Sequence, residues 1–290
     1  MPAQGIDVNQ ESLDPRLQEI INDPSYRLAY LDPDYITRED LRPLRLELEL
    51  LKPQMLLEEK GIRSTIVVFG GTQVKPADEA RHQLEEATRA LEADPEDTQA
   101  QRRLEVARQV ADNTRFYDEC REFARIASTY AKNHDGEFVV KTGGGPGIME
   151  AANRGAWEVD ADSIGLNITL PFEQVPNAYI TPGLCFQFNY FAIRKMHFLL
   201  RAKALICFPG GFGTLDELFT TLTLRQTGRM QDIPIILYCR DYWSGVVDFQ
   251  FLADQGVIRD EHLTLFQYAE SPRQTWDIIC RFHGLHDPAG

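Results

Sequence analysis

The chain has 290 residues, of which 43% are hydrophobic and 26% charged, a composition typical of a globular domain with a sizeable core. Its formal net charge of −14 repels nucleic acid and anionic membranes, so we expect neither as a partner. No segment approaches the roughly twenty apolar residues of a membrane span, and residues 1–14 lack the pattern of a secretory signal. We therefore expect a soluble, cytoplasmic protein.

The cysteines and histidines show no pattern typical of disulfides or metal sites. The five cysteines are widely scattered and form no C-x-x-C pair, which argues against a disulfide framework and a zinc site. The six histidines show no H-E-x-x-H or other metal-binding spacing. We expect a reducing environment, no protein-built metal site and no bound cofactor.

Residues 1–63 are predicted to form an N-terminal helical extension. From a capping-box-like Thr37 to Gly61, leucines and one methionine recur at spacings of three and four, the stripe of an amphipathic helix. Pro53 is expected to kink or split this helix. We expect the extension to pack on the core domain, residues 64–290, or on another subunit.

The core domain begins with a β-branched strand at residues 65–69. The highly charged segment 76–112 follows, with helical apolar spacing on both sides of Pro95, and predicts an inserted helical hairpin whose charges are solvated. The further predicted strands are 138–140, 163–170, 204–208, 233–238 and 263–266. The further predicted helices are 116–130, 146–157, 190–202, 214–226, 242–255 and 272–282, and the stretch between 170 and 190 is predicted to be irregular.

This alternation of apolar strands with helices predicts an α/β fold built on a doubly wound parallel sheet, in other words a Rossmann-like domain. Ligands on such sheets bind outside the carboxyl ends of the strands, where the turns lie.

One segment of this acidic chain carries positive charge only. Between Glu173 and Asp216 there is no acidic residue, yet four basic residues remain. They are Arg194, Lys195, Arg201 and Lys203. Burial of the segment would explain why acidic residues are missing, but not why basic residues remain. We therefore interpret the segment as a local anion-binding site. The alternative is a basic stripe whose aliphatic stems cover the sheet.

Two glycine-rich turns, residues 143–147 and 209–214, each follow a predicted strand and open a predicted helix. Glycine permits positive φ and close backbone approach, and a helix start presents free N–H groups, so each turn is a candidate phosphate site. Neither is a P-loop or a G-x-G-x-x-G motif. Asp162 precedes the next strand instead of ending it, so the ribose-binding acid of an NAD site is missing. A smaller ligand held from both sides fits better than a dinucleotide.

Glu217 has two interpretations. Thr214-Leu-Asp-Glu217 reads as a capping box, in which Thr214 caps the helix and Glu217 reaches back to it. Alternatively, the Glu217 carboxylate faces the ligand beside the second glycine turn. Asp216 is equally explained as a favourable acid at a helix start. The sequence pattern alone leaves both interpretations open.

The motifs resemble those of a known family. Arg194-Lys195, followed by Pro209-Gly-Gly-Phe-Gly-Thr-Leu-Asp-Glu217, resembles the R-K and P-G-G-x-G-T-x-x-E motifs of the Lonely Guy family. Residues 143–156 are similar to that family's first phosphate turn. The resemblance covers roughly residues 64–255, interrupted by the charged hairpin.

The resemblance implies hydrolysis of the N-glycosidic bond of a nucleoside 5′-monophosphate, AMP-like or a cytokinin riboside monophosphate, to a free base and ribose 5-phosphate. It assigns Arg194 and Glu217 as the catalytic pair. The residues that it assigns to substrate and phosphate binding are Gly144, Gly145, Gly147, Lys195, Gly210, Gly211, Gly213 and Thr214. It also implies a homo-oligomer, at least a dimer.

Members of this family often carry the label of lysine decarboxylase, which we reject because nothing in the chain indicates a pyridoxal phosphate site. The alternative function is a nucleotide-binding or sensing protein of the same fold without turnover. The chain departs from its relatives at Gly70-Gly-Thr-Gln73, where a G-S is common, and at Glu150, where several relatives have glycine.

Overall fold

The computed structural model describes residues 14–171 and 175–286. The chain forms two compact units, residues 1–50 and 51–290. In the first unit the described elements are the helices α1 (Pro15–Asn22) and α2 (Pro33–Ile36) and the 3₁₀ turns η2 (Pro24–Tyr26), η3 (Ala29–Leu31) and η4 (Glu39–Leu41). Asp14, Asp23 and Asp32 each precede a proline and accept a backbone N–H two residues on, so these Asp-Pro pairs start helical turns.

Helix α3 (Arg42–Glu59) is continuous and runs through Pro53. The predicted start at Thr37 is wrong, because the Thr37 hydroxyl donates back to the Pro33 carbonyl (2.7 Å) at the end of α2. Gly61, with φ +70°, follows the helix, as expected for a residue that permits left-handed backbone.

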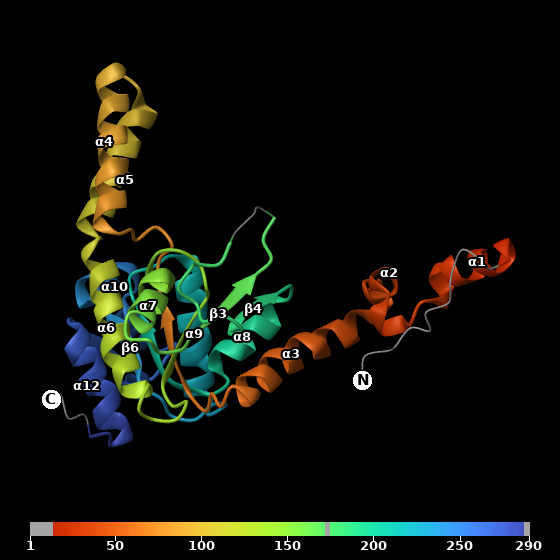
Figure 1. The fold of residues 1–290 in the computed structure, drawn as a ribbon. Helices are drawn as coiled ribbons and strands as arrows, with labels where there is room; N and C mark the ends of the chain where they lie inside the picture. Colours follow the sequence, from red (N-terminus) through yellow and green to blue (C-terminus); the bar gives the residue numbers. More distant parts are fainter. Residues whose placement is uncertain (1–13, 172–174, 287–290) are drawn as a thin grey trace. The chain divides into compact units, whose positions relative to one another are not determined.

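The second unit is built on seven parallel strands in the order β4-β3-β2-β1-β5-β6-β7 (Figure 1). The predicted α/β fold with a doubly wound parallel sheet is confirmed. The strands are β1 (Thr65–Phe69), β2 (Val139–Thr142), β3 (Ser163–Ile168), β4 (Cys185–Phe188), β5 (Ala202–Cys207), β6 (Ile235–Tyr238) and β7 (Gln267–Ala269). The order reverses between the neighbours β1 and β5, where Val67 lies beside Leu205.

Helices cover both faces of the sheet because successive strand residues point to opposite sides. Ile66 and Val68 pack with α6 (Arg115–Ala131), α7 (Ile148–Trp157) and α12 (Pro272–His283). Val67 and Phe69 pack with the opposite layer. That layer contains α8 (Phe191–Leu199), α9 (Phe212–Gln226), α10 (Arg240–Val246), α11 (Phe249–Asp254) and the end of α3 at Leu57.

Three predicted elements need correction. Strand β4 lies in the stretch predicted to be irregular, and the helix predicted at 242–255 is two helices, with Asp248 capping the second through the Phe251 N–H (2.9 Å). The strand predicted at 263–266 is also wrong. Residues Asp260–Thr264 form the 3₁₀ helix η5, and the strand is β7.

Two helices, α4 (Ala77–Ala93) and α5 (Thr98–Asp112), fill the segment for which the sequence predicts a hairpin. They pack on each other through Ala87, Leu104 and Ala107. Across the described parts of the chain, no helix combines the length and hydrophobicity needed to cross a membrane.

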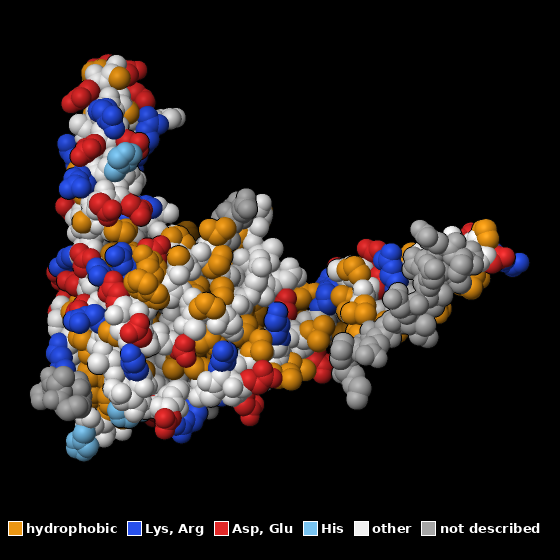
Figure 2. Space-filling view, in the orientation of Figure 1, with side chains coloured by type: hydrophobic (Ala, Val, Ile, Leu, Met, Phe, Trp, Pro, Cys, Tyr) orange, Lys and Arg blue, Asp and Glu red, His pale blue; other side chains and the backbone are white. Residues whose placement is uncertain are grey.

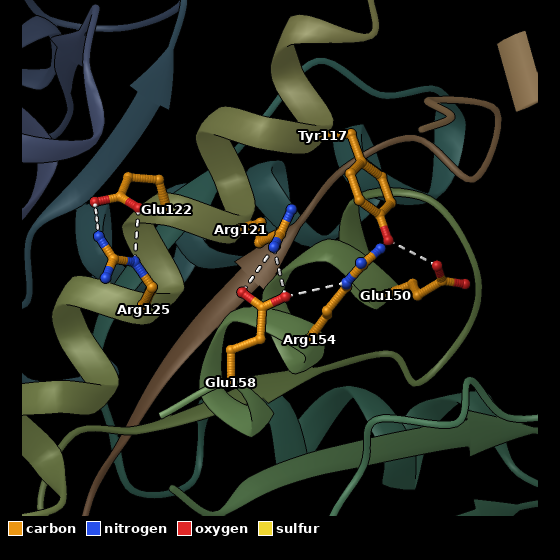
Figure 3. A network of polar contacts seen from close by, with 7 residues as sticks. All are labelled: Tyr117, Arg121, Glu122, Arg125, Glu150, Arg154 and Glu158. Carbon is orange, nitrogen blue, oxygen red and sulfur yellow. Dashed lines mark hydrogen bonds and ion pairs between the residues drawn. The ribbon is translucent and has the colours of Figure 1, made fainter. Parts of the chain in front are cut away.

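Polar contacts lock α6 against α7 (Figure 3). The Tyr117 hydroxyl donates to Glu150 (2.7 Å), and Glu158 accepts from both Arg121 (2.8 Å) and Arg154 (3.2 Å). Gly155 lets the two helices approach closely, because a Cβ there would overlap the Arg121 carbonyl oxygen. The helix that begins at the first glycine turn is therefore held rigidly.

We predict that Gly155→Ala lowers the free energy of unfolding by about 1–3 kcal/mol, because the added methyl would also lie 2.9 Å from the Ala124 Cβ. Gly245→Ala in α10 is the matched control. A Cβ there meets nothing within 4 Å, so the change should raise stability by about 0.5–1 kcal/mol. Urea denaturation measures both, and a Gly155→Ala protein as stable as the parent would contradict the packing described.

Candidate functional site

A cavity of about 380 Å³ opens at the carboxyl edge of the sheet, where the strand order reverses between β1 and β5. This is the place at which open parallel sheets bind ligands. Its polar and glycine lining comes from the ends of four strands and the starts of α8 and α9. Those residues are Gly70, Gly71, Thr72, Gly143, Asn167, Arg194, Gly211, Gly213, Thr214, Asp216 and Glu217. The apolar lining residues are Phe69, Met149, Ile168, Leu170, Phe191, Phe198 and Phe212.

Gly71 joins the turns that build the cavity. Its N–H donates to the Pro209 carbonyl (2.9 Å), and its own carbonyl accepts the Ile148 N–H (3.2 Å). Glycines make this approach possible: a Cβ on Gly147, whose φ is +73°, would overlap the Gly71 carbonyl oxygen, and one on Gly210 would lie 2.8 Å from the Gly71 nitrogen. Gly147 and Gly210 thus allow the turns to pack and do not line the cavity.

The start of α9 is open to the cavity. Gly211 is its N-cap and supplies no side-chain cap, and the first intrahelical bond runs from Leu215 N–H to the Gly211 carbonyl (3.0 Å). The N–H groups of residues 212–214 precede that bond and so have no partner within the helix. A Cβ on Gly211 or Gly213 would meet no atom within 4 Å, so these two residues leave space at the helix start. The arrangement suits an anion.

The start of α7, unlike that of α9, is already occupied by contacts within the protein. Its first N–H already bonds to Gly71, and its first turn carries the acid Glu150, which stabilises the positive end of the helix. Gly144 donates to the Thr142 hydroxyl (2.9 Å), and Asn177 binds the carbonyls of Gly144 (2.9 Å) and Gly145 (3.0 Å). Neither glycine lines the cavity.

Gly144 has a different role from the expected phosphate contact. Its φ is +74°, and a Cβ on it would overlap the side-chain amide of Asn167. Asn167, at the end of β3, is 8% exposed and lines the cavity. The glycine therefore makes room for a polar side chain in the cavity wall.

The capping-box interpretation of Glu217 is wrong, because the N-cap of α9 is Gly211, three residues before Thr214, and the helix begins at Phe212. Thr214 lies inside the first turn. The Glu217 side chain is 8% exposed and lines the cavity, and its Oε2 has no hydrogen-bond partner among the described residues. Burial raises the pKa of Glu217 to about 7, Lys195 and Arg194 work against this rise, and Asp216 adds to it.

Arg194 lies across the cavity on α8 and is fixed by the ends of two strands. Its Nε donates to the Leu166 carbonyl (2.7 Å), its Nη2 lies 3.4 Å from the Gly143 carbonyl, and its guanidinium sits 5.1 Å from the centre of the Phe198 ring. Burial lowers its pKa, and the nearby Glu217 opposes this. A guanidinium has five N–H donors, so these bonds orient the group and leave others for a ligand.

Two other bases of the positive segment, Lys195 and Arg201, bind other parts of the protein. Lys195 pairs with Asp216 (2.7 Å) and Thr220 (2.8 Å), which ties α8 to α9, and it does not line the cavity. Arg201 lies beyond the end of α8 with φ +67° and donates to the Ile62 carbonyl (2.9 Å).

One known protein family matches part of the chain. Residues 149–279, which include Arg194, Thr214 and Glu217, match the family described as "Possible lysine decarboxylase". This match covers less than half of the chain, and it is consistent with the resemblance of the motifs to the Lonely Guy family. No curated protein matches its sequence significantly.

Among solved structures, the chain is similar to the molybdenum cofactor binding protein of the phototrophic bacterium Rippkaea orientalis, with 16% identity and a TM-score of 0.49 over 76% of this chain and 98% of the other. It is also similar to the molybdenum cofactor carrier protein of Chlamydomonas reinhardtii, with 15% identity and a TM-score of 0.45 over 77% and 99%. Likenesses this distant carry no argument about function.

Sequence reasoning missed several lining residues. Asn167 had a usable signal, since it is a polar residue near the carboxyl end of a predicted strand. Phe191 and Phe212 occupy the first positions of α8 and α9, and both rings are largely exposed at the cavity. Nothing in the one-dimensional pattern distinguishes such rings from core aromatics. No cluster of three or more His, Cys, Asp or Glu that could hold a metal is found in the described residues.

We predict that burial of Glu217 makes stability depend on pH. Its pKa in the folded chain lies above the unfolded value of 4.5, so the folded state binds more protons between about pH 4.5 and 7, and the free energy of unfolding falls as pH rises through that range. Glu217→Gln removes this term. The stability of the variant relative to the parent should rise by up to about 3 kcal/mol between pH 5 and pH 8. Urea denaturation at both pH values measures it, and an equal difference at both would contradict the burial.

Proposed function

We propose that this cavity binds a nucleoside 5′-monophosphate and hydrolyses its N-glycosidic bond, releasing the base and ribose 5-phosphate. The observation that carries the proposal is the Glu217 carboxyl group, buried and unpartnered at Oε2, in the second turn of a helix whose N-terminus is open to the same cavity. A protein gains nothing structural from such a group. Desolvated, unpaired carboxyl groups in a cleft are typical of functional sites.

The open start of α9 would hold the phosphate. Each backbone N–H that bonds to a charged phosphate oxygen contributes about 1.5–3 kcal/mol, and the helix dipole adds about 0.3–1 kcal/mol. Arg194, fixed by two carbonyls, supplies planar donors from the opposite wall. We infer that Gly211, Gly213 and Thr214 form the phosphate site and that Gly144, Gly145, Gly147 and Gly210 shape it.

The reaction breaks the bond between C1′ of the ribose and the base nitrogen. Water supplies the hydroxyl that ends on C1′, and its proton ends on the base. Because the transition state resembles an oxocarbenium ion, a carboxylate beside the ribose can stabilise positive charge, hold the hydroxyls or activate the water. Glu217 fits all three roles, and its pKa of about 7 keeps both protonation states accessible near neutral pH.

The remaining walls suit a flat base. Apolar and aromatic side chains cover much of the cavity, among them Met149, Phe191 and Phe198. They do not suit lysine decarboxylation: no lysine lines the cavity in the described chain, so the Schiff base of a pyridoxal enzyme has no candidate. We also propose that the protein works in the cytoplasm, where its five free thiols stay reduced, and that it is a homo-oligomer.

We expect purified protein to release free base and ribose 5-phosphate from at least one of AMP, GMP, CMP and UMP, as measured by chromatography. Glu217→Gln should reduce kcat by at least about a hundredfold, since the reaction loses its charge-stabilising or water-activating group. Glu150→Gln is the matched control, because Glu150 is bound by Tyr117 outside the cavity, and it should keep its activity. Equal rates in the parent and Glu217→Gln would reject the enzyme.

We expect the rate of the parent to fall on the acid side of about pH 7, since stabilising positive charge and activating water both need the ionised Glu217. The pH profile of kcat/KM measures this. A profile that is flat from pH 5 to pH 8 would contradict a role for this carboxylate.

Arg194→Ala should abolish the thermal stabilisation that a monophosphate gives, because the variant loses the cation facing the phosphate site. Arg194→Lys should restore part of it, since a single point charge cannot reproduce the planar fork. If nucleotide stabilises the parent and no product forms, the protein is a binding or sensing protein of the same fold. If no monophosphate stabilises the parent, the nucleotide site itself is rejected.

A further inference from the structure

Helix α3 carries a stripe of apolar side chains that no other part of the described chain covers. They are Leu44, Leu48, Leu51 and Met55. Their spacings of four, three and four are those of the d and a positions of a heptad, so helix geometry alone puts them on one face. Figure 2 shows hydrophobic side chains along this helix. Pro53 and Leu57, on the opposite face, are buried. The C-terminal part of α3 is therefore anchored through that face, while the stripe stays exposed.

The two edges of this stripe carry opposite charge. Arg45 and Lys52 occupy the e positions on one edge, and Glu47 occupies the g position on the other. No ion pair joins Glu47 or Lys52 to another residue of the described chain. In a parallel pair of helices each g position faces the e position five residues on in the partner, whereas antiparallel pairing would bring e to e and g to g. Only the parallel arrangement therefore sets Glu47 against Lys52.

We propose that α3 pairs with α3 of a second copy of this chain as a parallel, in-register two-helix coiled coil. The stripe forms the seam, with Leu48 against its own copy, and two symmetric Glu47–Lys52 pairs flank it. The next g position, Gln54, faces Glu59 of the second copy, and this pair brings no like charges together. Because α3 is already folded and anchored, pairing does not require a new helix to form. None of the stripe residues lines the cavity, so the proposal does not depend on what the cavity binds.

A charge exchange tests the pairing in the full-length protein. Glu47→Lys and Lys52→Glu each replace two attractive contacts by two repulsive ones, so each should weaken self-association about tenfold. The double variant restores opposite charges and should recover the parent's association. Sedimentation at several concentrations measures the dissociation constant of the dimer. Glu92→Lys on α4 makes the same change in net charge as Glu47→Lys, and this control should leave the dissociation constant unchanged.

Cross-linking tests the register. With the exposed Cys185 replaced by serine, Leu48→Cys should form a covalent dimer with a short bismaleimide, and Glu92→Cys should not. A chain that stays monomeric at every concentration would overturn the proposal. A double charge variant no better than the single ones, or cross-linking of Leu48→Cys to Leu51→Cys but never to itself, would overturn the parallel arrangement.

Discussion

The contacts of Gly71 set the character of the site, because this one residue joins two turns that look alike in sequence. Its carbonyl takes the first N–H of α7, and its N–H holds the Pro209 carbonyl beside the start of α9. The first helix is thereby closed by the protein itself, and the second is left open. Two glycine-rich turns therefore differ: one leaves a helix start open, and the other is a structural support. Gly147 and Gly210 are needed for this asymmetry, since any side chain on them would separate the turns.

Two groups beside that open helix start lower the stability of the fold. Glu217 is buried without a full set of hydrogen-bond partners, and the half-buried Arg194 has its charge neutralised only in part. Proteins retain such polar groups where a bound ligand supplies the missing hydrogen bonds or the opposite charge. This explains why unsatisfied polar atoms line a cavity whose walls are otherwise rigid. The ion pair of Lys195 with Asp216 contributes differently: it sets α8 against α9, and so fixes the separation of the two buried charges.

Much of the fold was predictable because local signals agreed with one another. Residues 65–69 form a β-branched run between breaks, and they are strand β1 without correction. Strand β4 was not predictable, because it is a four-residue edge strand with Cys185 and Gln187 exposed and no distinguishing composition. For the site, the letters Thr-x-x-Glu fit a capping box and a catalytic carboxylate equally. Only the position of the N-cap at Gly211, set by how the turns pack, distinguishes them.

The central claim is that the amides at the start of α9 hold a phosphate while the Glu217 carboxylate faces the sugar beside it. A crystal structure of the Glu217→Gln protein with AMP tests this most directly, since the variant would keep the substrate intact. We expect phosphate oxygens at about 2.7–3.1 Å from the N–H groups of residues 212–214, with the residue 217 side chain against the ribose and Arg194 on the opposite wall. A nucleotide bound elsewhere, or a ribose out of reach of residue 217, would contradict it.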